Sequence, residues 1–113
     1  MAPQREADAI LAAREALGRR LAALRQAAGY SQRMFAPLTG YGRSTLASVE
    51  TGHQNVPREF WLRCEEVLGA CSLVDAYDEI RAMMAAERRA AADVAQAERE
   101  ARIAAWRQAR RDG

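Results

Sequence analysis

The sequence contains no lysine, and only one histidine and two cysteines occur among its 113 residues. A zinc site usually needs four ligands, and a catalytic nucleophile needs a base placed beside it. His53, Cys64 and Cys71 are too few to form a zinc site, and their spacing does not match a nucleophile with its base. We therefore expect no metal site, no cofactor and no enzymatic activity.

Long apolar runs are also lacking, although half of the residues are apolar. A membrane-spanning helix needs roughly 18 or more consecutive apolar residues, and the runs here are much shorter. No secretory signal pattern precedes the cysteines. We expect a cytoplasmic protein that has no membrane contact and keeps Cys64 and Cys71 as reduced thiols.

Aromatic residues are scarce at 6%, whereas alanine is abundant. Alanine favours closely packed helices, and strands are usually richer in aromatic and β-branched residues. The chain is long enough for one compact domain with an extension and too short for two full domains. The composition therefore predicts an all-α fold.

All 17 basic residues are arginine, whose planar guanidinium suits phosphate and guanine and stays charged near neutral pH. Their distribution is uneven. Residues 14–63 hold eight arginines and only three acidic residues, Glu15, Glu50 and Glu59, whereas residues 64–113 hold eight arginines and ten acidic residues. Positive charge is thus concentrated in the first half of the chain, as nucleic-acid binding requires.

Apolar spacing predicts a first helix that runs from about Arg5 to Ala28 and ends at Gly29. Its buried face is expected to contain Ile10, Leu17, Leu21, Leu24 and Ala28. Ser31 is a typical N-cap for a short second helix. We expect the buried side of that helix to contain Met34, Phe35 and Leu38, and we expect Pro37 to shorten or tighten it.

The segment Gly40-Tyr41-Gly42 predicts a turn, which leads into a third helix from Arg43 to Glu50. Its inward residues are Leu46 and Val49. After a polar loop, a fourth helix is expected to end at Gly69 and to be lined by Phe60, Trp61, Cys64, Val67 and Leu68. Because Phe60 and Trp61 are neighbours, we expect one of them in the core and the other capping the domain or touching the C-terminal helix.

Residues 73–111 contain neither proline nor glycine and predict one long helix or a broken pair. A straight helix of this length spans nearly 60 Å, at about 1.5 Å per residue. A stripe of mostly small residues follows coiled-coil spacing: Met83, Ala86, Ala90, Val94, Ala97, Ala101 and Ala104. This stripe, with Ile103 and Trp106, favours contact with a second copy or a protein partner, and a solvated solitary helix is the alternative.

A short helix, a glycine turn and a second short helix with a polar outer face form the order of a helix-turn-helix. The sequence of residues 31–52, SQRMFAPLTGYGRSTLASVETG, resembles the lambda-repressor-like (Xre-type) helix-turn-helix family, and the resemblance spans about Leu17 to Leu68. It implies an all-α, five-helix lambda-repressor-like fold in which residues 1–70 form the helix-turn-helix DNA-binding domain with an extended first helix. Residues 71–113 would then be a C-terminal helical extension for dimerisation or partner contact.

The resemblance also implies site residues. The outward positions of the recognition helix, which contact bases in that family, are occupied by Arg43, Ser44, Thr45 and Ser48. Gln32, Arg33, Asn55 and Arg58 stand where backbone contacts are expected, and Gln32 also braces the recognition helix. Arg25 and Glu50 occupy the positions of a structural ion pair between the first and third helices.

The function implied by the resemblance is sequence-specific binding of double-stranded DNA by a bacterial-type transcriptional regulator. It would act as a homodimer with residues 43–50 in the major groove. Because a fold alone does not fix a function, a different class stays open. The alternative is a protein-interaction adaptor, or an antitoxin-like accessory protein, built on a helix-turn-helix scaffold.

Overall fold

The computed structural model describes the backbone of residues 2–112 and the side chains of residues 7–112. These residues form five helices and no strand: α1 (Ala2–Ala27), α2 (Gln32–Thr39), α3 (Arg43–Glu50), α4 (Arg58–Leu68) and α5 (Leu73–Asp112). The all-α fold with a long C-terminal helix, predicted from the sequence, is confirmed. Within this part of the chain, no helix has the length and apolar character needed to cross a membrane.

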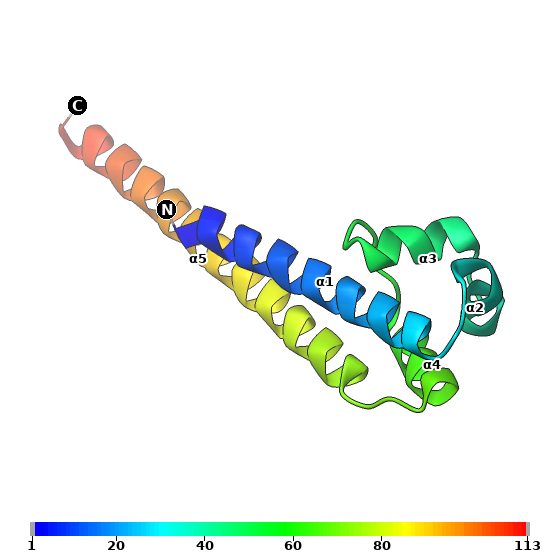
Figure 1. Cartoon of the computed structure of the whole chain (residues 1–113). Helices are drawn as coiled ribbons and strands as arrows, with labels where there is room; N and C mark the ends of the chain where they lie inside the picture. Colours follow the sequence, from blue (N-terminus) through cyan, green and yellow to red (C-terminus); the bar gives the residue numbers. More distant parts are fainter. Residues whose placement is uncertain (1, 113) are drawn as a thin grey trace.

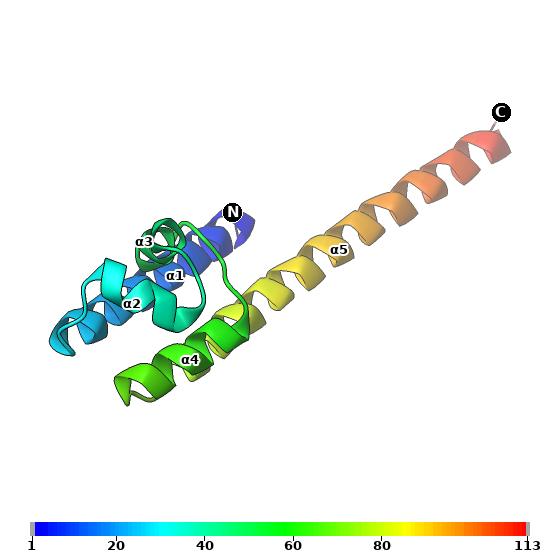
Figure 2. The same ribbon diagram turned by 90° about the vertical axis from the view of Figure 1, so that its right-hand side faces the viewer.

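Helices α1 and α5 lie side by side and run in opposite directions, while α2, α3 and α4 gather at one end of this pair (Figure 1). Helix α5 packs on α1 and α4, and α3 packs on α1 and α2. Figure 2 shows the same arrangement after a 90° turn, with α2 and α3 set apart from α5. The described residues extend over 75 × 21 × 20 Å, which reflects the length of α5.

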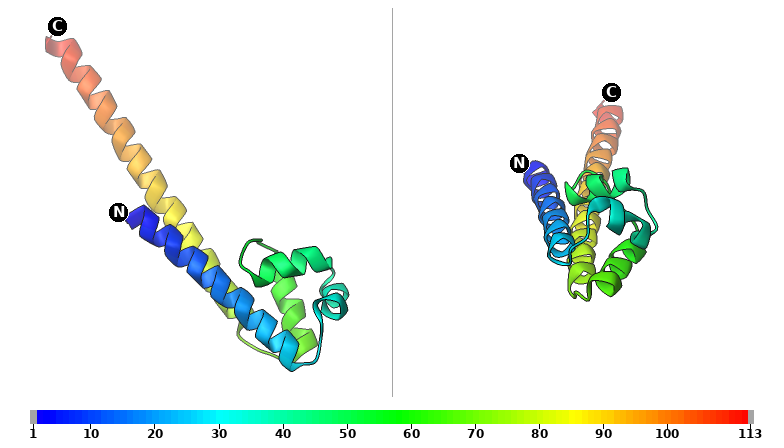
Figure 3. Two further views of the ribbon diagram at one scale, coloured as in Figure 1. Left: turned by 45° about the horizontal axis from the view of Figure 1, so that its top comes forward. Right: turned by 45° about the vertical axis from the view of Figure 1, so that its right-hand side comes forward.

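The second half of α5 projects away from the rest of the protein. Figure 3 shows α5 continuing past the N-terminal end of α1 with no other element beside it. Residues 88–112, which we call the distal arm, are all exposed. Of the two forms predicted for this region, one long helix or a broken pair, the structure has the single helix.

The core lies where α1, α2, α3, α4 and the start of α5 meet. Its largest fully buried side chains are Phe35, Phe60, Leu21, Leu46, Leu73 and Cys64. Phe60 and Trp61 are both buried. The prediction placed one in the core and the other capping the domain or touching the C-terminal helix; Trp61 does touch that helix, but the burial of both side chains was not predicted. The physical reason is that α5 covers a second side of α4. The ring centroids of Trp61 and Tyr77 of α5 are 6.4 Å apart, and those of Phe60 and Tyr41 are 5.6 Å apart.

Helix α2 has the predicted ends. Ser31 is its N-cap, and the Ser31 hydroxyl accepts a hydrogen bond from the Met34 amide at 3.0 Å. At the other end Gly40 adopts φ 84°, a left-handed conformation that glycine reaches without a side-chain clash. The Gly40 amide donates to the carbonyl of Pro37, so the helix closes with a tightened turn at the proline, as predicted.

The buried side of α2 differs from the prediction. Phe35, Ala36 and Thr39 are buried, whereas Met34 and Leu38 are exposed. Each residue of a helix is rotated by about 100° from the one before it. The buried face of α2 centres on Phe35, Ala36 and Thr39. Met34 and Leu38 are rotated by about 100° and 60° from Phe35 in the direction away from Ala36, so they face solvent.

Candidate nucleic-acid interface

Helix α3 is a short helix with defined ends on both sides. It follows Gly42, whose extended backbone begins the helix without a side-chain cap. At its C-terminal end, the Thr51 hydroxyl donates to the carbonyls of Ala47 and Ser48, and the His53 amide donates to the Ser48 carbonyl at 2.9 Å. These bonds satisfy carbonyls that the helix itself leaves without partners.

The two sides of α3 differ in burial. Leu46 and Val49 are buried in the core, at 0% and 2% exposure. The opposite side, which we call the outer face of α3, consists of Arg43, Ser44, Thr45 and Ser48; the first two are exposed and the last two half-buried. Helix α5 packs on α1 and α4, and its distal arm points away from α3, so the outer face is open to a partner (Figure 1).

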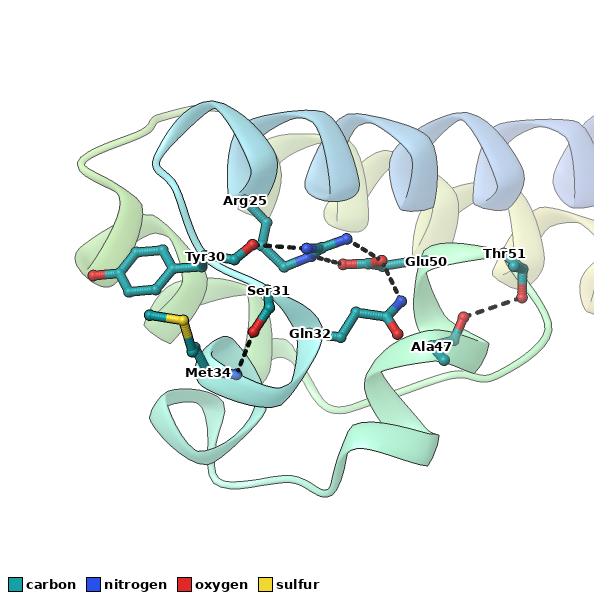
Figure 4. A network of polar contacts seen from close by, with 8 residues as sticks. All are labelled: Arg25, Tyr30, Ser31, Gln32, Met34, Ala47, Glu50 and Thr51. Atoms are coloured by element: carbon teal, nitrogen blue, oxygen red, sulfur yellow. Dashed lines mark hydrogen bonds and ion pairs between the residues drawn. The ribbon is translucent and has the colours of Figure 1, made fainter.

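A polar cluster around Glu50 joins α1, α2 and α3 (Figure 4). The Arg25 guanidinium, at the C-terminal end of α1, donates from Nε to Glu50 Oε2 at 2.6 Å and from Nη2 to Oε1 at 3.1 Å. Its Nη1 donates to the carbonyl of Tyr30 at 2.8 Å. Gln32 Nε2, at the first turn of α2, donates to Glu50 Oε1 at 2.9 Å.

Both partners of this ion pair are buried, with side-chain exposures of 7% for Arg25 and 5% for Glu50. A buried carboxylate at the end of α3 would be unfavourable alone, because the last turn of a helix carries partial negative charge. The two-pronged bond from Arg25 and the amide of Gln32 compensate for it. The cluster therefore fixes the angle between α2 and α3, on which any fit to a DNA groove depends.

Gly18 of α1 sets the close approach of α1 and α3, a role that the sequence analysis did not assign. A Cβ on Gly18 would lie 2.5 Å from the carbonyl oxygen of Glu50 and 2.6 Å from that of Val49, both shorter than real contacts. A glycine inside an alanine-rich helix costs about 1 kcal/mol against alanine and usually has a packing reason. That was the signal that could have pointed to Gly18.

The remaining residues predicted to contact the DNA backbone are exposed. Arg33 is exposed on α2, and Asn55 is exposed in the loop between α3 and α4. Arg58, the first residue of α4, donates from Nε to Asp78 Oδ1 at 3.0 Å and from Nη2 to Oδ2 at 3.3 Å. The hydrogen bond and the charge of Asp78 raise the pKa of Arg58. Asp78, a residue of α5, was not anticipated from the sequence.

A helix, a glycine turn and a second helix with an open polar face, held by a buried ion pair to the first helix of the domain, define a helix-turn-helix domain. Domains of this class bind double-stranded DNA through the second helix of the motif. A family model described as a helix-turn-helix domain matches residues 16–77, more than half of the chain, and the chain belongs to this family, which is of the Xre/lambda-repressor-like kind. The family predicted from residues 31–52 is thus confirmed. The comparisons with curated proteins and with solved structures gave no match.

Proposed function

We propose that the protein is a cytoplasmic, sequence-specific transcriptional regulator that inserts α3 into the major groove of its operator. The observation that carries this proposal is the open outer face of α3, which begins with the exposed guanidinium of Arg43. In helix-turn-helix domains, the N-terminal residues of the second helix reach the base edges. An arginine at that end can form two hydrogen bonds with guanine, worth about 1 to 3 kcal/mol of discrimination.

The roles of the other outer-face residues follow from their chemistry. Ser44, Thr45 and Ser48 carry small hydroxyls that reach base edges or nearby phosphates without blocking the entry of the helix. They add contacts around the arginine and set its position along the groove. Sequence preference therefore centres on Arg43.

The backbone contacts are assigned to Gln32 and Arg33 on α2, Asn55 in the loop after α3 and Arg58 at the start of α4. Gln32 bonds Glu50 through one N–H of its amide, and the second N–H of the same group is the donor for a phosphate. Arg33 and Asn55 are exposed. Arg58 exchanges its bond with Asp78 for a phosphate when the duplex docks. Contacts of this kind position the protein and contribute affinity that depends on salt.

We assign residues 1–70 to the DNA-binding unit and residues 71–113 to an extension that joins two copies. Leu73, Val74 and Ile80 at the start of α5 are buried in the domain. The side of α5 that packs near α1 continues along the distal arm through the exposed Val94 and the small residues of the stripe. Its continuity with an existing helix contact supports pairing with a second copy, which places two α3 helices on two half-sites.

Selection of bound sites from a random duplex pool tests the proposal most directly, because enriched sites also report symmetry and half-site spacing. Arg43→Ala is expected to lose the sequence preference, and Arg33→Ala to weaken all sequences alike and reduce the salt dependence. The matched control is Arg102→Ala, which removes the same charge from the distal arm. Equal enrichment by the native protein and by Arg43→Ala would contradict the assignment of α3.

One observation favours a second candidate, a protein-interaction adaptor. Trp106 is 59% exposed near the end of α5, with the Arg110 guanidinium 4.9 Å above its ring, and Ile103 is exposed one turn earlier. Large exposed apolar side chains often mark a contact with another protein. Retention on random duplex DNA at low salt separates the two functions, since an adaptor with no DNA role flows through.

A further inference from the structure

A pocket lies on the side of the domain where α1, the loop between α3 and α4, and α5 meet. Its volume is about 240 Å³. The apolar part of its wall comes from all of these elements and from α4, and includes Leu17, Val56, Trp61, Ile80 and Met84. None of the outer-face residues of α3 lines this pocket, although Asn55, one of the proposed backbone contacts, does.

Two arginines from different helices line the same pocket: Arg14 of α1 and Arg81 of α5. Neither forms an ion pair with any side chain of residues 7–112, and none of the lining residues is acidic. An anion that enters this space would be attracted by both positive charges. The amide side chains of Gln54 and Asn55 add hydrogen-bonding groups to the wall.

We propose that this pocket binds a small organic acid, made of one aromatic ring or a branched aliphatic chain with a single carboxylate. The carboxylate is held by the guanidinium groups of Arg14 and Arg81, whose paired N–H donors match its two oxygens. The apolar body packs against Trp61, Ile80 and Met84. Small-molecule sites commonly combine such an apolar wall with a few polar groups.

The size of the pocket narrows the ligand class. Pockets for drug-sized ligands span roughly 300 to 1,000 Å³, so a space of about 240 Å³ suits a small acid and is too small for a nucleotide. The apolar wall also favours this ligand over a bare inorganic anion, which would make no apolar contact with the pocket.

The fluorescence of Trp61 gives a direct test. The chain has two tryptophans, so Trp106→Phe leaves Trp61 as the single reporter. In this background, titration with phenylacetate is expected to give a saturable change in fluorescence. Phenylacetamide, which has the same shape and no charge, is expected to bind at least tenfold more weakly, and inorganic phosphate is expected to give no saturable change.

Substitutions of the two arginines then test which positive charges bind the carboxylate. Arg14→Gln and Arg81→Gln are each expected to weaken phenylacetate binding at least tenfold while the helical circular dichroism spectrum stays unchanged. Arg88→Gln, which removes an exposed arginine outside the pocket, is the matched control and should bind as the native chain does. The proposal is overturned if phenylacetate gives no saturable change, if the amide binds equally well, or if Arg88→Gln weakens binding as much as Arg81→Gln. All these measurements are made without DNA, so their failure leaves the proposed regulator function untouched.

Discussion

Gly18 of α1 lies directly against the backbone carbonyl of Glu50, the last residue of α3, with no room for a Cβ between them. The contact joins backbone to backbone, so it cannot be relieved by moving a flexible side chain. It brings α1 close enough to α3 for Arg25, two turns further along α1, to reach the Glu50 carboxylate. Gly18 and the Arg25–Glu50 ion pair therefore stabilise the same contact between α1 and α3.

Gly18→Ala is expected to lower the free energy of unfolding by about 2 kcal/mol, because overpacking costs typically 1 to 3 kcal/mol and the better helix propensity of alanine offsets only part of it. Urea denaturation followed by circular dichroism measures the change. Gly42→Ser serves as the control: nothing lies within 4 Å of a Cβ there, and φ is −77°. A serine cap should leave stability equal or raise it by a few tenths of a kcal/mol. Equal stability of Gly18→Ala and the native protein would show that the two helices separate easily.

Arg25→Met is expected to destabilise the fold by about 3 to 5 kcal/mol, because it leaves the buried Glu50 carboxylate without its charged partner. The double variant Arg25→Met with Glu50→Leu removes both charges and should recover much of that loss. A double-mutant cycle in denaturant, with Glu50→Leu alone as the fourth corner, gives the coupling energy. Additive effects of the two single changes would mean that the pair contributes nothing beyond packing.

Asp78→Asn is expected to tighten binding to any duplex a few-fold at low salt. It releases the Arg58 guanidinium for phosphate and removes a negative charge beside it. The melting temperature should change little, since both side chains are about half exposed, at 55% and 47%. Fluorescence anisotropy over a salt series measures the effect. Asp93→Asn, which neutralises an acid on the distal arm, is the control and should bind DNA as the native chain does.

The Cys64 thiol is expected to make the free energy of unfolding depend on pH in the alkaline range. Burial raises the pKa of its thiol to about 12, and the charges of Glu50 and Glu65 add to the effect. In the unfolded chain the thiol ionises near its ordinary value of about 9. The unfolded state therefore binds fewer protons between these values, and stability falls as pH rises from about 9 toward 12. Denaturation from pH 8 to pH 10.5 should show this slope in the native protein, and Cys64→Ala should reduce it.

The distal arm should determine the oligomeric state. Val94 is 56% exposed in the single chain and lies in the middle of the small-residue stripe. Val94→Glu is expected to convert a dimer to a monomer, because a charge on the contact face must be buried without a partner. Sedimentation equilibrium at micromolar concentration measures the mass. Ala92→Glu, on the opposite side of the same helix, should remain a dimer, and a native mass equal to one chain would remove the dimer assignment.

The sequence predicts helix ends well where local chemistry determines them. Ser31, Gly40 and Gly69 carry their own capping or turn preferences, and the boundaries of α3 follow from Gly42 and Thr51 around a short apolar pattern. The family motif then indicates which face of α3 is polar. Each of these features depends on residues within one or two helical turns, so no tertiary information is needed.

Features that depend on which helix covers which face were predicted only in part. Phe60 and Trp61 are both buried because α5 returns over α4, and Met34 is exposed because it is rotated away from the buried face of α2. The partner of Arg58 lies 20 residues further along, at Asp78 on another helix. The spacing of apolar residues within one helix does not indicate which residues of other helices will contact it.

Helix α5 is continuous from its N-terminal turns, which are packed against α1 and α4, to the exposed end of the distal arm. Ile80 is buried at the base and Trp106 lies near the tip, and no glycine or proline interrupts the helix between them. A partner bound at the end of the distal arm would therefore also affect the orientation of α3, because α5 has no glycine or proline at which it could bend. Each residue of α5 adds about 1.5 Å and 100° of rotation, so in the proposed dimer one residue inserted between Ile80 and Trp106 would rotate each α3 relative to the contact between the two copies.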